Sequence, residues 1–318
     1  MPNAKSHSAR PGFAHVSGLQ WYSQNIRDLP NVDELMLGHT RYPLFAQFLS
    51  EFEKDTLRSH HSSCPVPGIT GILGLANSPR TRMSTCHACI RSDIKAQGYA
   101  IWRREHLVPA AYVCATHQEP LMTFCDLCEA GHRRMRSNWR LSTKCICGVH
   151  SMKPILKTDS IGMELGIRLA TMVEKVLIQE VPPSLSSDSI TKILVHTFGV
   201  QRSRSNTSAQ RLLEALRDKC GRDMTDYLGI KKETALRLVG LPTGHGAVRN
   251  PMHNLAALYV VSDAMEGFEE KLALATESEA YRFMSENEQS VIANPRKRKK
   301  RLSGDDRPET TGPDLKLV

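Results

Sequence analysis

Four short pairs of potential metal ligands decide the fold of this chain: Cys86-His-Ala-Cys89, Cys114-Ala-Thr-His117, Cys125-Asp-Leu-Cys128 and Cys145-Ile-Cys147. Residues 90–113 separate the first two pairs, and residues 129–144 separate the last two. Zinc binds four thiolate or imidazole ligands in a tetrahedron, and two short turns can supply two ligands each. The sequence therefore predicts two closed sites and two Zn²⁺ ions per chain.

The fourth ligand of the first site has an alternative. His106 lies between Cys89 and Cys114 and could take the place of His117. The two-residue gap of Cys114-x2-His117 lets both side chains reach one ion, which favours His117.

The length and composition limit the classes of protein to which this chain can belong. The chain has 318 residues, of which 40% are hydrophobic, enough for about two domains with real cores. Residues 1–35 contain no apolar run of signal-peptide length, and the apolar stretch 255–261 is shorter than the roughly 20 residues of a membrane span. We therefore expect a cytoplasmic protein with no membrane partner. Because thiols stay reduced there, the clustered cysteines favour metal sites over disulfides.

The charge predicts an anionic partner. The chain carries 42 Lys and Arg against 33 Asp and Glu, a net charge of +9. Residues 130–158 contain no acidic residue, so this stretch is the predicted phosphate-binding face. We expect contacts with double-stranded DNA from its basic side chains and from two arginines of the first metal site's loop: Arg133, Arg134, Arg136, Arg140, Lys144, Arg103 and Arg104.

Composition divides the chain into five segments. We expect an irregular segment 1–31 with a short ordered piece near Leu19, a helical lead-in 32–81, a double zinc-binding module 82–153, a helical domain 154–284 and a basic, disordered tail 285–318. The predicted fold class is mostly α with a central zinc-ribbon-like module of small β structure. The helical domain follows that module.

Apolar spacing predicts the main helices. In residues 42–60, apolar side chains recur every three or four residues and predict one helix with a buried stripe: Leu44, Phe45, Phe48, Leu49, Phe52 and Leu57. A second stripe predicts a helix from Ile161 to Leu177, which Pro182 and Pro183 cannot continue. Further helices are expected over 188–199 and 210–219, and from Asn250-Pro251 onward.

A candidate helix-turn-helix lies at 221–240. Two short helices, 223–228 and 231–239, flank a turn at Gly229-Ile230. The second helix would present its polar side chains to a DNA groove: Lys231, Lys232, Thr234 and Arg237. The alternative is plain packing in a helical bundle, because any bundle contains two helices joined by a glycine turn.

The sequence argues against an enzyme. His117-x-Glu119 followed by Cys125-x2-Cys128 resembles parts of the zinc deaminase signature. Only residues 120–124 intervene, however, and Phe124 stands where a deaminase has proline. Both predicted sites are closed, and closed zinc sites are structural. No nucleotide-binding loop and no Gly-x-Ser-x-Gly turn is present.

The metal module and its flanks resemble the TniQ family of TnsD-type transposon target-selection proteins. The resemblance is carried by the ligand pairs as far as Cys128, by the segment 98–106 (GYAIWRREH), and by Pro109 and Glu119-Pro120-Leu121. Upstream, His39-Thr40-Arg41-Tyr42-Pro43-Leu44-Phe45 with Phe48-Leu49 matches. Downstream, Tyr227-Leu228-Gly229 and residues 250–255 (NPMHNL) match. The resemblance covers about residues 32–262.

The resemblance implies a non-catalytic adaptor of DNA recombination in a mobile element. Such an adaptor selects a target by reading DNA or by docking on an RNA-guided effector complex, and then recruits an AAA+ ATPase that brings the transposase. A rival prediction is a zinc-dependent protein-docking module that has no sequence-specific DNA binding of its own.

Overall fold

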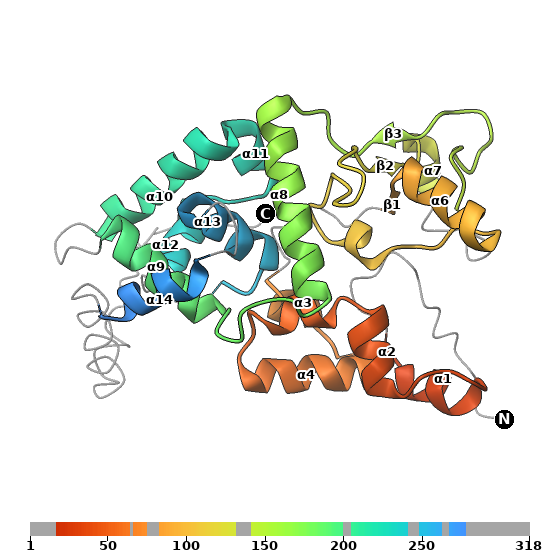
Figure 1. Ribbon diagram of the computed structural model, residues 1–318, viewed down its shortest axis with the longest axis horizontal. Coiled ribbons are helices and arrows are strands. Elements are labelled where there is room, and N and C mark those ends of the chain that lie inside the picture. Colours follow the sequence, from red (N-terminus) through yellow and green to blue (C-terminus); the bar gives the residue numbers. More distant parts are fainter. Residues whose placement is uncertain are drawn as a thin grey trace, which may run out of the picture.

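Helix α8 (Ser160–Leu177) lies between a helical bundle and the module that carries the clustered cysteines (Figure 1). The computed structural model describes residues 17–63, 66–74, 83–131, 141–199, 205–240, 248–262 and 267–277. The side chain of Asp159 caps α8 by accepting a hydrogen bond from the Gly162 amide at 2.8 Å. The predicted stripe is buried from Leu165 to Leu177, but Ile161 at its beginning is exposed.

The lead-in segment is a cluster of short helices with its own small core. They are α1 (Leu19–Asn25), α2 (Val32–His39), α3 (Tyr42–Ala46), α4 (Glu51–Ser62) and α5 (Ile69–Ile72). The single helix predicted over 42–60 is wrong, because Ser50 and Glu53 form a capping box that starts α4 afresh. Phe52, assigned to the buried stripe, is therefore 80% exposed.

The cysteine-bearing module is built around a sheet of three very short strands. Its elements are β1 (Ser84–Thr85), α6 (His87–Gln97), the 3-10 helix η1 (Arg104–Leu107), β2 (Met122–Thr123), α7 (Asp126–Gly131) and β3 (Lys153–Pro154). The strand order is β1-β2-β3, and both pairings are antiparallel. Two-residue strands cannot hold a module of this size, so its stability must come from elsewhere.

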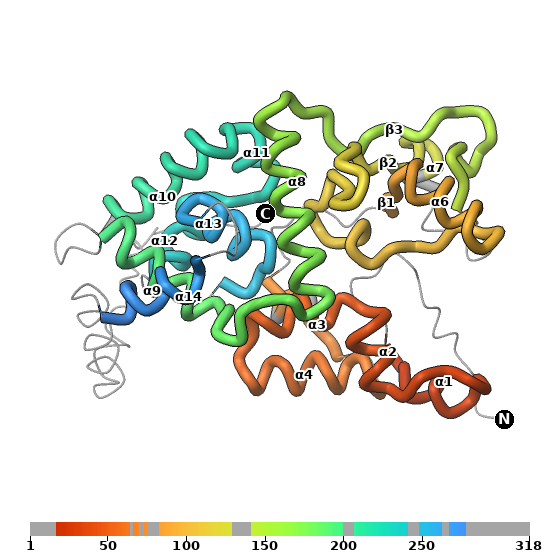
Figure 2. The backbone as a smooth tube through the Cα atoms, in the orientation of Figure 1, coloured from red at the N-terminus to blue at the C-terminus, as the bar shows by residue number. Residues whose placement is uncertain are grey.

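The helical bundle follows α8 and contains the largest core. Figure 2 traces it from green to blue through α9 (Ser187–Phe198), α10 (Ser205–Cys220), α11 (Arg222–Tyr227), α12 (Lys232–Leu238), α13 (Pro251–Ser262) and α14 (Phe268–Glu277). Helix α13 is buried from Pro251 to Tyr259. Lys219 and Lys271 donate hydrogen bonds to carbonyls of Tyr259, Val260 and Val261, which satisfies its C-terminal end.

The three parts of the molecule share one core through α8. The largest apolar cluster joins bundle residues to Leu44 and Phe48 of the lead-in segment and to Tyr112 and Val113 of the cysteine-bearing module. At Gly166 a Cβ atom would lie 2.4 Å from a methyl carbon of Val113 and 2.6 Å from the ring of Tyr112. The absence of a side chain at Gly166 therefore lets the module approach α8 closely.

Two arginines tie the lead-in segment to the module. The guanidinium of Arg104, in η1, donates to the carbonyls of Leu37 and Thr40 at the end of α2 and to the carbonyl of Leu177 at the end of α8. In return, the buried Arg41 donates to the carbonyl of Leu107. A guanidinium suits this junction because its fixed fork of donors can reach several acceptors at once.

Among the described residues, no helix combines the length and the apolar character that crossing a lipid bilayer requires.

Candidate metal centres

Strand topology explains why the eight ligands assemble as two sets of four. In an antiparallel sheet, the end of one strand lies beside the beginning of the next. Cys86 directly follows β1, and the turn with Cys114 and His117 precedes β2. One strand further on, the pattern repeats: Cys125 follows β2, and the turn with Cys145 and Cys147 precedes β3. The two clusters therefore lie at opposite ends of the sheet.

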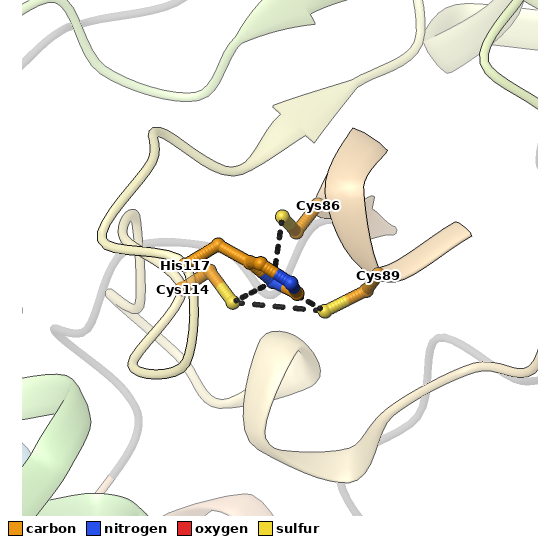
Figure 3. Close-up of side chains that lie close together, drawn as sticks. All are labelled: Cys86, Cys89, Cys114 and His117. Atoms are coloured by element: carbon orange, nitrogen blue, oxygen red, sulfur yellow. Dashed lines mark hydrogen bonds between the residues drawn. The ribbon is translucent and has the colours of Figure 1, made fainter. Parts of the chain in front are cut away.

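The first cluster contains Cys86, Cys89, Cys114 and His117, whose ligand atoms all lie within 4.8 Å of one another. Figure 3 shows the two cysteines of the α6 turn facing the loop that carries the other two residues. The Nδ1 atom of His117 is 3.6 Å from the sulfurs of Cys86 and Cys114 and 3.3 Å from that of Cys89. His106 is not part of this cluster, so the structure favours His117 between the two histidines.

The second cluster contains Cys125, Cys128, Cys145 and Cys147, again with every sulfur within 4.8 Å of the others. The sulfurs of Cys125 and Cys147 are 3.9 Å apart. The amide of Cys125 donates to the Cys145 sulfur at 3.3 Å. Three of the four cysteines are buried, whereas Cys147 is exposed.

The distances fit a tetrahedral metal ion. With Zn–S bonds of about 2.3 Å and Zn–N bonds of about 2.0 Å, a regular tetrahedron places sulfurs about 3.8 Å apart and sulfur and nitrogen about 3.5 Å apart. The shortest separations, 3.3 to 3.9 Å, match these edges, and every pair of ligand atoms within a cluster lies within 4.8 Å. These separations are far longer than the roughly 2.05 Å of a disulfide bond. Each cluster can therefore hold one metal ion through four protein ligands.

The electrostatics of the clusters favour a cation. Hydrogen bonds from the thiols of Cys114 and Cys89 lower the pKa of the Cys86 thiol. In the second cluster, the amide and then the ring of His150 lower the pKa of Cys147 to about 5. Hydrogen bonds between the thiols raise the pKa of Cys89 and Cys114, and burial raises the pKa of Cys128. Each site therefore contains a readily deprotonated sulfur beside thiols that a bound cation would have to deprotonate.

Cys220 and His106 are both buried in the interior of the protein. Cys220 ends α10 in the main core, and burial raises the pKa of its thiol to about 11. His106 is buried, its backbone carbonyl accepts a hydrogen bond from the Ser84 hydroxyl, and burial lowers the pKa of its ring. Both residues are buried, and neither belongs to the two sets of four clustered ligands.

The structure gives Arg103 and Arg104 partners inside the molecule. Arg103 pairs with the buried carboxylate of Asp93 at 2.7 Å and with Glu105 at 3.8 Å. Arg104 holds the junction of α2 and α8. Of the basic stretch predicted to face phosphates, Lys144 is exposed, whereas Arg133, Arg134, Arg136 and Arg140 lie outside the described residues.

The two helices of the candidate helix-turn-helix are α11 and α12. Gly229, with φ +74°, forms the turn: its amide donates to Asp226, and the Ile230 amide donates to Thr225. This is the Schellman pattern, in which a left-handed glycine ends a helix. Helix α10 packs against both α11 and α12.

The exposed face of α12 is narrower than the sequence predicted. Lys231 and Lys232 at its beginning are exposed, and Arg237 is half-buried. Thr234, which was expected to point outward, is buried, because it faces the core together with Ala235 and Leu238. Only the first turn of the helix therefore offers cationic side chains to solvent.

His150 was not among the ligands predicted from the sequence. Its Nδ1 atom lies 3.4 Å from the sulfur of Cys147. A signal was present, because Cys147-x2-His150 has the same spacing as Cys114-x2-His117.

Comparison with known proteins finds a distant similarity to one transposition protein. The chain is 23% identical over 212 residues to the transposon Tn7 transposition protein TnsD of Escherichia coli, an alignment that covers 64% of this chain and 40% of that protein. The aligned part thus spans less than half of the relative's length. No family model matches the chain.

Proposed function

We propose that this chain is a non-catalytic target-selection adaptor of a transposition system, which binds double-stranded DNA and recruits an AAA+ ATPase regulator. The similarity to a transposition protein over 212 residues carries the proposal. The resemblance of its metal module to the TniQ family supports the adaptor role.

We propose Zn²⁺ as the ion in both clusters. Seven thiols and one imidazole are the ligands that zinc prefers, and their spacing fits its tetrahedral geometry. Each ion would have four protein ligands and no free position for a water molecule, which is the arrangement of structural zinc. The bound ions would then stabilise a module whose strands are only two residues long. This supports a binding role rather than hydrolysis.

The proposed DNA surface has two parts. Lys231 and Lys232 lie at the beginning of α12, the end from which a recognition helix contacts bases. Lys144 belongs to the acid-free stretch 130–158, whose arginines would contact phosphates: Arg133, Arg134, Arg136 and Arg140. Arg103, Arg104 and Arg237 are engaged or partly buried within the molecule, so the proposal does not depend on them.

The salt dependence of DNA binding tests this assignment. Replacing Arg133, Arg134 and Arg136 with alanine should flatten the slope of log affinity against log salt by about one unit for each phosphate that the variant no longer binds. Replacing Lys231 and Lys232 should reduce discrimination between target and random DNA. Arg91 and Lys95 are exposed on α6 outside the proposed surface, so the R91A/K95A variant is the control. Unchanged affinity and slope in the triple variant would refute the phosphate-binding role.

Recruitment is tested by co-purification. An AAA+ ATPase from the same transposon should be retained on DNA only when this chain is present. Genes for such an ATPase and a transposase beside the gene of this chain would support the role. Failure of the ATPase to bind the chain, with or without DNA, would overturn this part of the proposal.

A second candidate function is a docking module for a protein, such as a subunit of an RNA-guided effector complex. The observation that favours it is apolar exposure around the second cluster, where Leu127 is 72% and Val149 is 82% exposed. Exposed apolar side chains are typical of protein-binding surfaces. Tight binding to a protein partner together with weak, non-specific DNA binding would favour this function over DNA reading.

A further inference from the structure

The two clusters have the same arrangement of ligand pairs and strands. The first cluster contains a histidine ligand, and this arrangement predicts a corresponding histidine for the second. In each cluster, a cysteine pair follows one strand and a turn before the next strand completes the set. The completing turn of the first cluster is Cys114-x2-His117. In the second it is Cys145-x-Cys147, and a histidine stands three residues after Cys147.

The two Cys-x2-His turns also have the same local geometry. The Nδ1 atom of His117 is 3.6 Å from the Cys114 sulfur, and the Nδ1 atom of His150 is 3.4 Å from the Cys147 sulfur. In both turns the histidine amide hydrogen-bonds to the cysteine sulfur. Gly148, with φ +68°, bends the second turn so that its amide reaches the Cys145 carbonyl at 2.9 Å. The separation of 3.4 Å is close to the roughly 3.5 Å between nitrogen and sulfur ligands on one zinc ion.

His150 lies outside the four-residue set of the second cluster and is a fifth potential donor beside it. The four sulfurs of the cluster form the complete set, and the ring of His150 lies against one of them. That neighbour, Cys147, is exposed, whereas Cys125, Cys128 and Cys145 are buried. An oxidant or electrophile therefore reaches Cys147 before the other three ligands.

We propose that His150 is the reserve ligand of the second cluster, which binds the metal through Nδ1 when the Cys147 thiolate is lost. The site then changes from four thiolates to three thiolates and one imidazole, the donor set of the first cluster. The ring of His150 is exposed, and a neutral imidazole that binds a metal through one ring nitrogen carries its proton on the other. The inference rests on metal binding at this cluster and is independent of the DNA-binding role.

A double-mutant cycle on the full chain tests the inference. The affinity of the second site for Zn²⁺ or Co²⁺ is measured by chelator competition in wild type, C147A, H150A and C147A/H150A. In wild type, H150A should change the affinity little, because four thiolates remain. In the C147A background, the same substitution should lower the affinity at least tenfold. Equal effects of H150A in both backgrounds would overturn the inference.

Cys145→Ala is the matched control, because no histidine follows Cys145 at the same spacing. C145A should lose the second metal ion, whereas C147A should retain it. The visible spectrum of the Co²⁺ form reports ligand identity: C147A should shift toward the spectrum of a site with three sulfurs and one nitrogen. A spectrum of C147A that is unchanged by the further H150A substitution would also overturn the inference.

Alkylation of the wild-type chain avoids any question of folding. Iodoacetamide forms a carbon–sulfur bond with the exposed Cys147, and iodide leaves. Wild type should retain two metal ions per chain after this single modification, and the H150A variant should retain one. Loss of the second ion from both proteins at the same rate would contradict a reserve ligand. If untreated wild type binds only one ion, the metal assignment of the second cluster fails instead.

Discussion

The phenol of Tyr112 donates a 2.6 Å hydrogen bond to the backbone carbonyl of Gly162, and both groups are buried. Tyr112 belongs to the cysteine-bearing module, and Gly162 lies in the first turn of α8. The bond therefore joins the module to the helix on which the bundle is built.

Replacing Tyr112 with phenylalanine isolates this hydrogen bond, because the ring and its edge contact with Tyr227 remain. The buried carbonyl of Gly162 loses the phenol but keeps the backbone hydrogen bond within α8, so the free energy of unfolding should fall by about 0.5–1.5 kcal/mol. Urea denaturation of the zinc-loaded protein measures this change. A variant as stable as wild type would show that another donor or water replaces the phenol.

Gly166→Ala tests the close approach of the module to α8. The added methyl would overlap the side chains of Val113 and Tyr112, so the variant should lose about 1–3 kcal/mol of stability. Gly38→Ala is the matched control, since Gly38 lies in α2 and a Cβ there meets nothing within 4 Å. The control should be neutral or stabilised by up to about 1 kcal/mol. Equal stability of both variants would mean that the module can shift without cost.

Arg104→Ala should destabilise the protein by about 2–4 kcal/mol, because three backbone carbonyls lose a charged donor. Arg104→Lys should restore little of the loss, since an ammonium lacks the fork that reaches several acceptors. The exposed Arg91 is the control, and its alanine variant should lie within about 0.5 kcal/mol of wild type. If the Arg104→Ala variant bound DNA more weakly at unchanged stability, Arg104 would instead belong to the phosphate-binding surface.

Metal analysis should find two zinc ions per chain, because each cluster supplies four ligands. Cys86→Ser should retain one ion. Removing both ions with a chelator should abolish the folded module, since its three strands contain only two residues each. Circular dichroism and protease sensitivity of residues 83–131 report the loss. A chelated protein that keeps its fold would refute a structural role for the metal.

His253 should make stability depend on pH. Its ring is buried, and burial lowers its pKa to about 4, so it is neutral in the folded protein near neutral pH. The unfolded ring has a pKa of about 6.5 and takes up a proton below that value. The contribution of His253 is therefore complete above pH 6.5 and is lost as the pH falls toward 4, by about 3 kcal/mol in all.

The His253→Gln variant, which does not titrate, separates this effect from acid release of the metal ions. Urea denaturation at pH 7 and pH 5 should show a smaller loss of stability for the variant than for wild type. An identical loss in both proteins would assign the acid sensitivity to the metal ligands instead.

The sequence predicted the features that short-range patterns determine. Ligand pairs separated by one or two residues can be recognised in the sequence, and the structure brings all eight ligands together in the predicted sets of four. The long apolar stripe of α8 and the glycine turn before α12 are equally local, and both are present.

The features that the sequence did not reveal depend on contacts between distant segments. Nothing near Arg104 indicates that its partners are carbonyls 64 to 73 residues away, so its charge suggested DNA instead. Thr234 looks like a surface residue of a short helix, but the bundle covers it. The start of a new helix at Ser50 can be recognised in the sequence from the capping-box pair Ser50 and Glu53. The regular apolar spacing across this position nevertheless suggested one continuous helix.

The junction at Arg104 also constrains how the chain can be made. Its acceptors are contributed by residues 37, 40 and 177, so a growing polypeptide cannot complete the set until the ribosome has passed the end of α8. In any expressed fragment that stops before Leu177, one nitrogen of the Arg104 guanidinium lacks its carbonyl acceptor. Fragments designed to isolate the cysteine-rich part should therefore extend through Leu177.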